Sequence, residues 1–228
     1  MQTLNVTVLS GQIESLSSGL DSAIFKRPIT QATALLELGL QCDQQADKKH
    51  HGGVDRALHL YPQEHYQHWQ SLYPHFSCFH PGSFGENLST LGAVESQVCI
   101  GDVFTLGDAV VQVSQPRSPC FKLNHRFNVP NMALMLQVNG FGGYLFRVLQ
   151  PGLIEPHSCL SLLSRDHPDL TVKEVAWQFF NDPLNRRFLQ RLMECSTLSE
   201  SWKIKAKQRL ASGMVEDWNK RLFGFNSV

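Results

Sequence analysis

The sequence has no excess of charge of either sign. Lysine and arginine together number 20, and aspartate and glutamate also number 20. Proteins that bind nucleic acid or an anionic membrane through their overall field carry a basic excess. We therefore expect no nucleic-acid partner, and the basic stretch at 203–209 is better explained as a solvated helix face. Any anion-binding site has to be local.

Long apolar runs are also missing. No stretch approaches the roughly 20 apolar residues that a membrane-spanning helix requires. The first residues, MQTLNVTVLSGQIESL, have neither a basic head nor a long apolar segment, so they do not resemble an export signal. We therefore expect a cytoplasmic protein that does not insert into membranes.

Paired cysteines are absent. None of the six cysteines forms a Cys-x-x-Cys motif, and a disulfide framework is not expected in a chain of 228 residues without an export signal. Most such thiols behave as small buried apolar side chains. A cysteine with a chemical role therefore has to be recognised from its neighbours.

Short strands separated by turns occupy the first two-thirds of the chain. The expected strands are short apolar or alternating segments bounded by turn residues, at 4–8, 23–25, 102–106, 109–113, 143–149 and 160–163. Gly107-Asp108 is typical of a tight hairpin turn. Short helices are expected from Pro62, from Ser118-Pro119 and over 131–138. This pattern favours a barrel or folded sheet over a doubly wound sheet.

The pattern of apolar residues changes near residue 168. Thr171 and Glu174 form a capping box, and apolar residues then recur at helical spacing to the end of the chain. We expect helices from 171, over 185–194 and from 199. The predicted fold is mixed α+β, with a β-rich, barrel-like domain at 1–167 and a three-helix domain at 168–228.

The segment around Cys120 is the most informative. Ser118 is a good helix cap and Pro119 suits a first helical position, which predicts Cys120 in the first turn of a helix. The helix dipole, Arg117 and Lys122 would then favour the thiolate. A thiolate binds a soft metal or attacks an electrophile. The alternative is a buried cysteine beside a turn.

Two further segments could contact a ligand. The run at 48–56, KKHHGGVDR, combines paired glycines with cations and could hold phosphate without being a P-loop. The run at 84–88, FGENL, carries Asn87, which can donate and accept hydrogen bonds. Taken alone, the first segment is weak evidence, because polar loops with a glycine turn are common, and the second is better explained as a plain turn.

Together these segments resemble a family. HGGVDRAL at 51–58, FGENL at 84–88, IGD at 100–102 and SQPRSPCFKL at 114–123 occur in this order in bacterial YiiM-type MOSC-domain proteins. The likeness extends over nearly the whole chain, including SAIFK at 22–26. One departure is His50, where the family pattern leads us to expect an aliphatic residue.

The resemblance implies a MOSC domain, a three-helix C-terminal domain and a molybdenum cofactor (molybdopterin). It implies that Cys120 is the catalytic residue and ligates molybdenum. The implied cofactor-binding residues are those that match the family's site positions, namely Lys26, His51, Asn87, Gln115, Arg117 and Cys120.

The resemblance also implies an oxidoreductase that reduces N-hydroxylated compounds such as hydroxylaminopurines. This reaction detoxifies mutagenic base analogues and gives resistance to 6-N-hydroxylaminopurine. The chain has no flavin, haem or iron–sulfur signature, so a separate reductase is expected to donate electrons. An alternative is a molybdenum-cofactor or sulfur carrier with a persulfide on Cys120. The sequence does not predict an oligomeric state.

Overall fold

The computed structural model describes residues 3–16 and 19–225. Its main element is a nine-stranded sheet in the order β1-β14-β10-β11-β12-β8-β9-β2-β5, antiparallel except where β8 pairs with β9. The strands are β1 Leu4–Asn5, β2 Thr7–Ser10, β5 Arg27–Pro28, β8 Leu58–Pro62, β9 Leu88–Thr90, β10 Val103–Leu106, β11 Ala109–Pro116, β12 Tyr144–Gln150 and β14 Cys159–Ser164.

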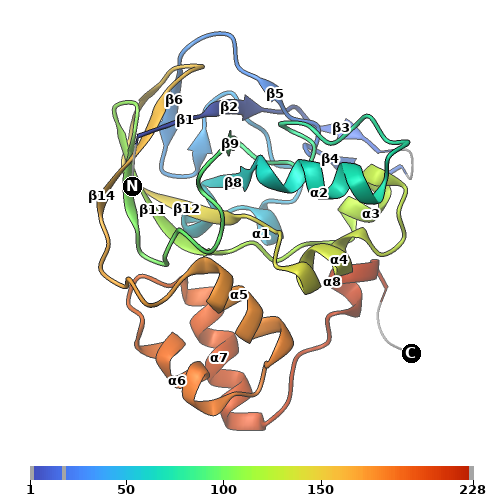
Figure 1. The fold of residues 1–228 in the computed structure, drawn as a ribbon, viewed down its shortest axis with the longest axis vertical. Helices are drawn as coiled ribbons and strands as arrows, with labels where there is room; N and C mark the ends of the chain where they lie inside the picture. Colours follow the sequence, from blue (N-terminus) through green and yellow to red (C-terminus); the bar gives the residue numbers. More distant parts are fainter. Residues whose placement is uncertain (1–2, 17–18, 226–228) are drawn as a thin grey trace.

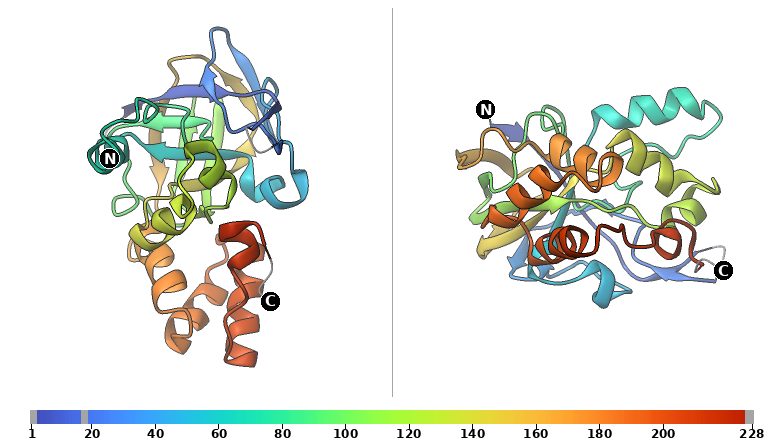
Figure 2. Two further views of the ribbon diagram at one scale, coloured as in Figure 1. Left: turned by 90° about the vertical axis from the view of Figure 1, so that its right-hand side faces the viewer. Right: turned by 90° about the horizontal axis from the view of Figure 1, so that it is seen from below.

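The sheet curls until its two ends approach each other (Figures 1 and 2). β1 lies at one edge and β2 next to the other, yet only Val6 separates them along the chain. Val6 is buried, and its N–H donates to the Ser158 carbonyl at 3.2 Å. The predicted barrel-like fold is therefore confirmed, in the form of a curled half-barrel.

Two small sheets complete the β structure. One contains β13 Gly152–Ile154, β6 Thr33–Leu36 and β7 Gly39–Leu40, and the other contains β3 Glu14–Ser15 and β4 Asp21–Ser22. The predicted hairpin is confirmed, because Leu106 pairs with Ala109 across Gly107-Asp108. Gly107 has a φ of 56°, a value that glycine adopts without strain.

The strand expected at 23–25 is wrong. These residues lie between β4 and β5 and belong to no strand of the described chain. Ile24 is buried in an aromatic core cluster with Tyr61, Trp69 and Phe84, and Phe25 packs against the same cluster. The apolar run therefore reflects burial of side chains in this cluster rather than pairing in a ladder.

Helices cover one side of the barrel and extend below it (Figure 1). They are α1 Lys48–His51, α2 Glu64–Leu72, α3 Lys122–Phe127, α4 Met132–Asn139, α5 Val172–Asn181, α6 Arg186–Glu194, α7 Glu200–Ser212 and α8 Asn219–Phe223. None of the helices in the described residues is both long and apolar enough to cross a membrane.

The predicted C-terminal helices form as α5, α6 and α7. The side chain of Thr171 accepts a hydrogen bond from the Glu174 N–H at 3.1 Å, as a capping residue does. Side chains of these helices, such as Phe179 and Trp202, share one continuous core with the barrel. The boundary at 167/168 stays a prediction, and α8 was not predicted.

Candidate functional site

Cys120 lies in the connection between β11 and α3, two residues before the helix begins. The prediction that it sits in the first turn is wrong, because α3 starts at Lys122 and Ser118 does not cap it. The Leu123 N–H donates to the Cys120 carbonyl at 3.0 Å. In a helix starting at Pro119 it would bond the Pro119 carbonyl instead, but that carbonyl accepts from Arg221 at 2.7 Å.

His51 reaches Cys120 from a segment 69 residues earlier. His51 Nε2 lies 3.4 Å from the Cys120 Sγ. Short helix α1, which carries His51, is capped by Asp47, whose carboxylate accepts from the His50 N–H at 3.1 Å. The same carboxylate lies 3.9 Å from His51 Nδ1. The HGG segment and the cysteine segment therefore meet at one site.

This contact controls the charge of the thiol. Burial by itself would raise the pKa of Cys120, but the hydrogen bond and charge of His51, together with the charge of Arg117, lower that pKa to about 7. Cys120 is half-buried. It can therefore be a thiolate near neutral pH and still be reached from outside.

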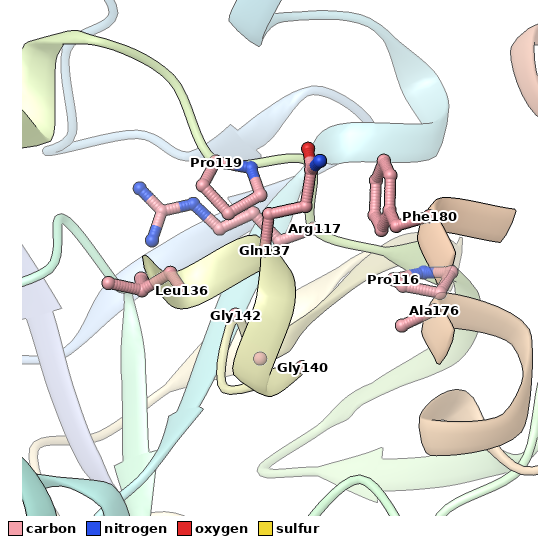
Figure 3. Close-up of a pocket in the computed structure, with 10 residues that line it drawn as sticks. Pro116, Arg117, Pro119, Leu136, Gln137, Gly140, Gly142, Ala176 and Phe180 are labelled. Carbon is pink, nitrogen blue, oxygen red and sulfur yellow. The ribbon is translucent and has the colours of Figure 1, made fainter. Parts of the chain in front are cut away.

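Arg117 supplies the positive charge beside the thiol. Its backbone N–H donates to the Gly143 carbonyl at 3.1 Å, which fixes the residue at the end of β11. Figure 3 shows its guanidinium beside Pro119 and Leu136, away from Phe180. Burial lowers the pKa of Arg117, while the charges of Cys120 and Glu86 raise it.

The Arg117 side chain has unused hydrogen-bonding capacity. Its Nη1 is buried and has no partner among the residues that the structure describes. A buried donor without a partner costs about 1–3 kcal/mol, and more when it is charged. A small cavity of about 10 Å³ borders Arg117, room for about one water molecule. We call Cys120, His51 and Arg117 the Cys120 cluster.

Lys26 and Asn87 meet each other, but around an acid that the sequence analysis missed. Lys26 forms an ion pair with Asp43, and both side chains are buried. Asn87 Nδ2 donates to the other Asp43 oxygen at 2.9 Å, and Asn87 Oδ1 accepts from the His59 N–H at 3.2 Å. We call Lys26, Asp43 and Asn87 the Asp43 cluster, whose polar groups bond one another.

Gln115 faces the helical domain. Its buried amide oxygen accepts from the Ser201 hydroxyl of α7 at 3.4 Å. Arg56 of the HGG segment also reaches Ser201, at 3.4 Å. His50, the departure from the family pattern, points its Nδ1 at Asp47, 2.9 Å away, and leaves Cys120 to His51. The roles of Lys26, Asn87 and Gln115 stay predictions.

Glu86 in the FGENL segment holds its own loop in place. Its buried carboxylate accepts from the Tyr66 hydroxyl, from the Gly82 N–H at 2.6 Å and from the Phe84 N–H at 2.9 Å. Burial raises the pKa of Glu86. These bonds fix the loop that carries Asn87, the residue next to Glu86.

The chain matches two family models. The MOSC domain model matches residues 47–158, and the YiiM-like, 3-alpha helix domain model matches residues 170–213. The chain is 43% identical to protein YiiM of Escherichia coli strain K12, over 96% of this chain and 98% of that protein. It belongs to the YiiM family of MOSC-domain proteins.

Solved and curated relatives agree with this assignment. The crystal structure of YiiM from Escherichia coli superposes with a TM-score of 0.84 at 37% identity, covering 98% of this chain and 100% of that one. A protein named reductase from Gibberella moniliformis is 37% identical over 74% of this chain, which corresponds to 30% of that protein.

Proposed function

We propose that this protein is a molybdenum-cofactor-dependent reductase of N-hydroxylated compounds such as hydroxylaminopurines. The observation that carries the proposal is the Cys120 cluster, where a thiolate-forming cysteine interacts with the charge of Arg117, whose buried Nη1 has no partner among the described residues. Membership of the MOSC family and the relative named reductase support it.

The residues present fit the proposed cofactor. A thiolate is a suitable ligand for a soft metal, and the unpaired Arg117 Nη1 can donate to an anionic group. When bound, the molybdenum cofactor supplies the chemistry that removes oxygen from an N–OH group in a two-electron reduction. Cys120 would hold the metal, and Arg117 would bind an anionic part of the cofactor.

The protein's own contribution is to fix the charge of Cys120 and the position of Arg117 before the cofactor binds. The hydrogen bond and charge of His51 help to lower the pKa of Cys120 to about 7, so a large share of the sulfur is thiolate, the form that ligates, near neutral pH. Arg117 is held in place by its backbone hydrogen bond, and its guanidinium is already removed from water before any ligand binds. Such preorganisation reduces the reorganisation needed on binding. We expect a separate reductase to donate the electrons.

Metal and pterin analysis tests this proposal. The wild type and Cys120→Ser are purified from a host that makes the cofactor, with Cys159→Ser as the control, since Cys159 is exposed on β14. We expect molybdenum and pterin in the wild type and the control, and their loss in Cys120→Ser. Full occupancy of Cys120→Ser would overturn the assignment of Cys120 as the metal ligand.

The reaction needs its own assay. Loaded protein, an artificial two-electron donor and a hydroxylaminopurine should give the corresponding aminopurine, and Cys120→Ser should give none. If the protein binds the cofactor but forms no amine from any N-hydroxylated compound, the assignment of the binding site stands and the proposed reductase activity is rejected.

A sulfur carrier is a second candidate, favoured by the His51–Cys120 contact. A thiolate near neutral pH can attack the outer sulfur of a persulfide donor, so that Cys120 becomes a persulfide and the donor leaves as its thiolate. Mass spectrometry after incubation with a persulfide donor should then show the mass of one added sulfur atom at Cys120, roughly 32 mass units. An unmodified Cys120 would reject the carrier.

A further inference from the structure

The last helix, α8, returns from the helical domain to the cysteine segment. Figures 1 and 2 show it beside α4, apart from α5, α6 and α7. Asn124 of α3 donates from Nδ2 to the Leu222 carbonyl at 2.8 Å. Gly224 lies against the Phe121 ring so closely that an added Cβ would come within 3.0 Å of it. The helix therefore packs on the residues that follow Cys120.

Arg221 bonds the peptide groups on both sides of Cys120. Its Nη1 donates to the Pro119 carbonyl at 2.7 Å, and its own carbonyl accepts from the Phe121 N–H at 2.7 Å. Its Nη2 donates to Gln137 Oε1 of α4 at 2.6 Å. One residue thus links the segment before the cysteine, the segment after it and the neighbouring helix.

Arg221 is itself anchored in the helical domain. Its guanidinium lies 5.4 Å from the Phe180 ring of α5 and 5.9 Å from the Trp218 ring. Trp218 Nε1 donates to Glu216, and Glu216 forms two 2.9 Å hydrogen bonds with Arg209 of α7. Arg209 is only 2% exposed. The position of α8 is therefore fixed relative to α5 and α7.

These contacts lie where the observed start of α3 differs from the predicted one. The Ser118-Pro119 pattern favours a helix that includes Cys120, in which the Leu123 N–H would bond the Pro119 carbonyl. Arg221 donates to that carbonyl, and Leu123 bonds the Cys120 carbonyl instead. Removing the Arg221 side chain frees the Pro119 carbonyl, so the peptide next to Cys120 loses one of the bonds that hold the sulfur in place beside His51.

We propose that Arg221 is a positioning residue for Cys120, so that α8 is part of the site although it lies outside both matched segments. This role rests on the proposed function, because it matters only if Cys120 is the reactive side chain. The guanidinium is suited to it, because its planar fork can donate to two acceptors on different elements at once.

The test uses the full-length, cofactor-free chain, so it does not depend on reductase activity. The rate of iodoacetamide alkylation at Cys120, resolved from the other cysteines by mass spectrometry, is measured against pH. We expect Arg221→Met to raise the midpoint by about one unit or more, because the sulfur is no longer held beside His51 and the positive charge of Arg221, which interacts with Cys120, is lost. Arg221→Lys keeps the charge but donates from a single nitrogen, so it separates the two causes: it should also raise the midpoint, by less than Arg221→Met, whereas a purely electrostatic role would leave it at the wild-type value.

Lys220→Met is the matched control, because Lys220 is the exposed cation next to Arg221 on α8. It should leave the midpoint unchanged. An Arg221→Met midpoint equal to that of the wild type would overturn the proposal, whatever the thermal stability of the variant.

If Arg221→Met does not fold, a measurement on the wild type tests whether α8 holds the cysteine segment. Hydrogen exchange at the Phe121 amide should proceed at the rate of the α8 amides of Leu222 and Gly224, because opening α8 breaks the Phe121 bond. Exchange at the rate of an unprotected amide would show that α8 does not hold the cysteine segment, and the proposal would fall.

Discussion

The Cys120 cluster and the Asp43 cluster contain similar groups but differ in how those groups are satisfied. In the Asp43 cluster, Lys26 and Asn87 both bond the Asp43 carboxylate. In the Cys120 cluster, Arg117 lies near the thiol with one guanidinium nitrogen unpaired. A polar group that is fully bonded within the protein stabilises the fold, whereas one left unpaired has capacity for a ligand.

The largest effect on stability should come from breaking the Asp43 cluster. Asp43→Ala leaves the Lys26 ammonium buried without a partner, which should cost about 3–5 kcal/mol of unfolding free energy. Urea denaturation measures it. The double variant Lys26→Met with Asp43→Leu is the control and should lie closer to the wild type. A loss below about 1 kcal/mol for Asp43→Ala would show that this cluster is not structural.

Removal of the Arg117 charge should give the opposite pattern. Arg117→Met should weaken cofactor retention by about 10–100-fold, the loss of a charge-assisted hydrogen bond, measured as molybdenum content during dilution. The cofactor-free variant should be no less stable than the wild type, because an unpaired buried donor has been removed. Unchanged retention with a large loss of stability would make Arg117 a structural residue like Lys26.

Removal of His51 should change the thiol while the fold is retained. His51→Ala removes the main influence that lowers the pKa of Cys120, so the alkylation midpoint should rise from about 7 by roughly one unit or more. The thiolate would then be lost between pH 7 and the higher midpoint. His50→Ala should have no such effect, since its ring bonds Asp47. An unmoved midpoint in His51→Ala would contradict the assigned contact.

The smallest effect should come from Asp47. Its carboxylate is partly exposed and lies 3.9 Å from His51 Nδ1, where solvent screens the charge. Asp47→Asn keeps an oxygen that can cap α1 and should shift the Cys120 midpoint by less than about half a unit. A shift as large as that of His51→Ala would show that Asp47 and His51 act as a unit.

The elements that the sequence predicted well depend on neighbours along the chain. The Gly107-Asp108 hairpin and the Thr171 cap are determined by residues within a few positions. The start of α3 was predicted wrongly, and there Arg221, about 100 residues later, donates to the Pro119 carbonyl. Local capping signals cannot anticipate such a tertiary bond.

The candidate site shows the same limit. The family motifs indicated His51, Arg117 and Cys120, and the structure brings these three together. Asp43 and Arg221 lie in no recognised motif, and their partners are distant in sequence. A lysine-rich or arginine-rich tail helix normally predicts a solvated face, so no local pattern assigns Arg221 to the interior.

The single residue between β1 and β2 has a consequence for how the chain folds. β1 pairs with β14, so that Leu4 lies opposite Leu160, while β2 pairs with β9 and β5. The barrel cannot close until residues 159–164 have left the ribosome, and closure requires one of the longest loops in the chain to form. We therefore expect slow, late closure of the barrel, with β1 unpaired during synthesis until β14 has been made.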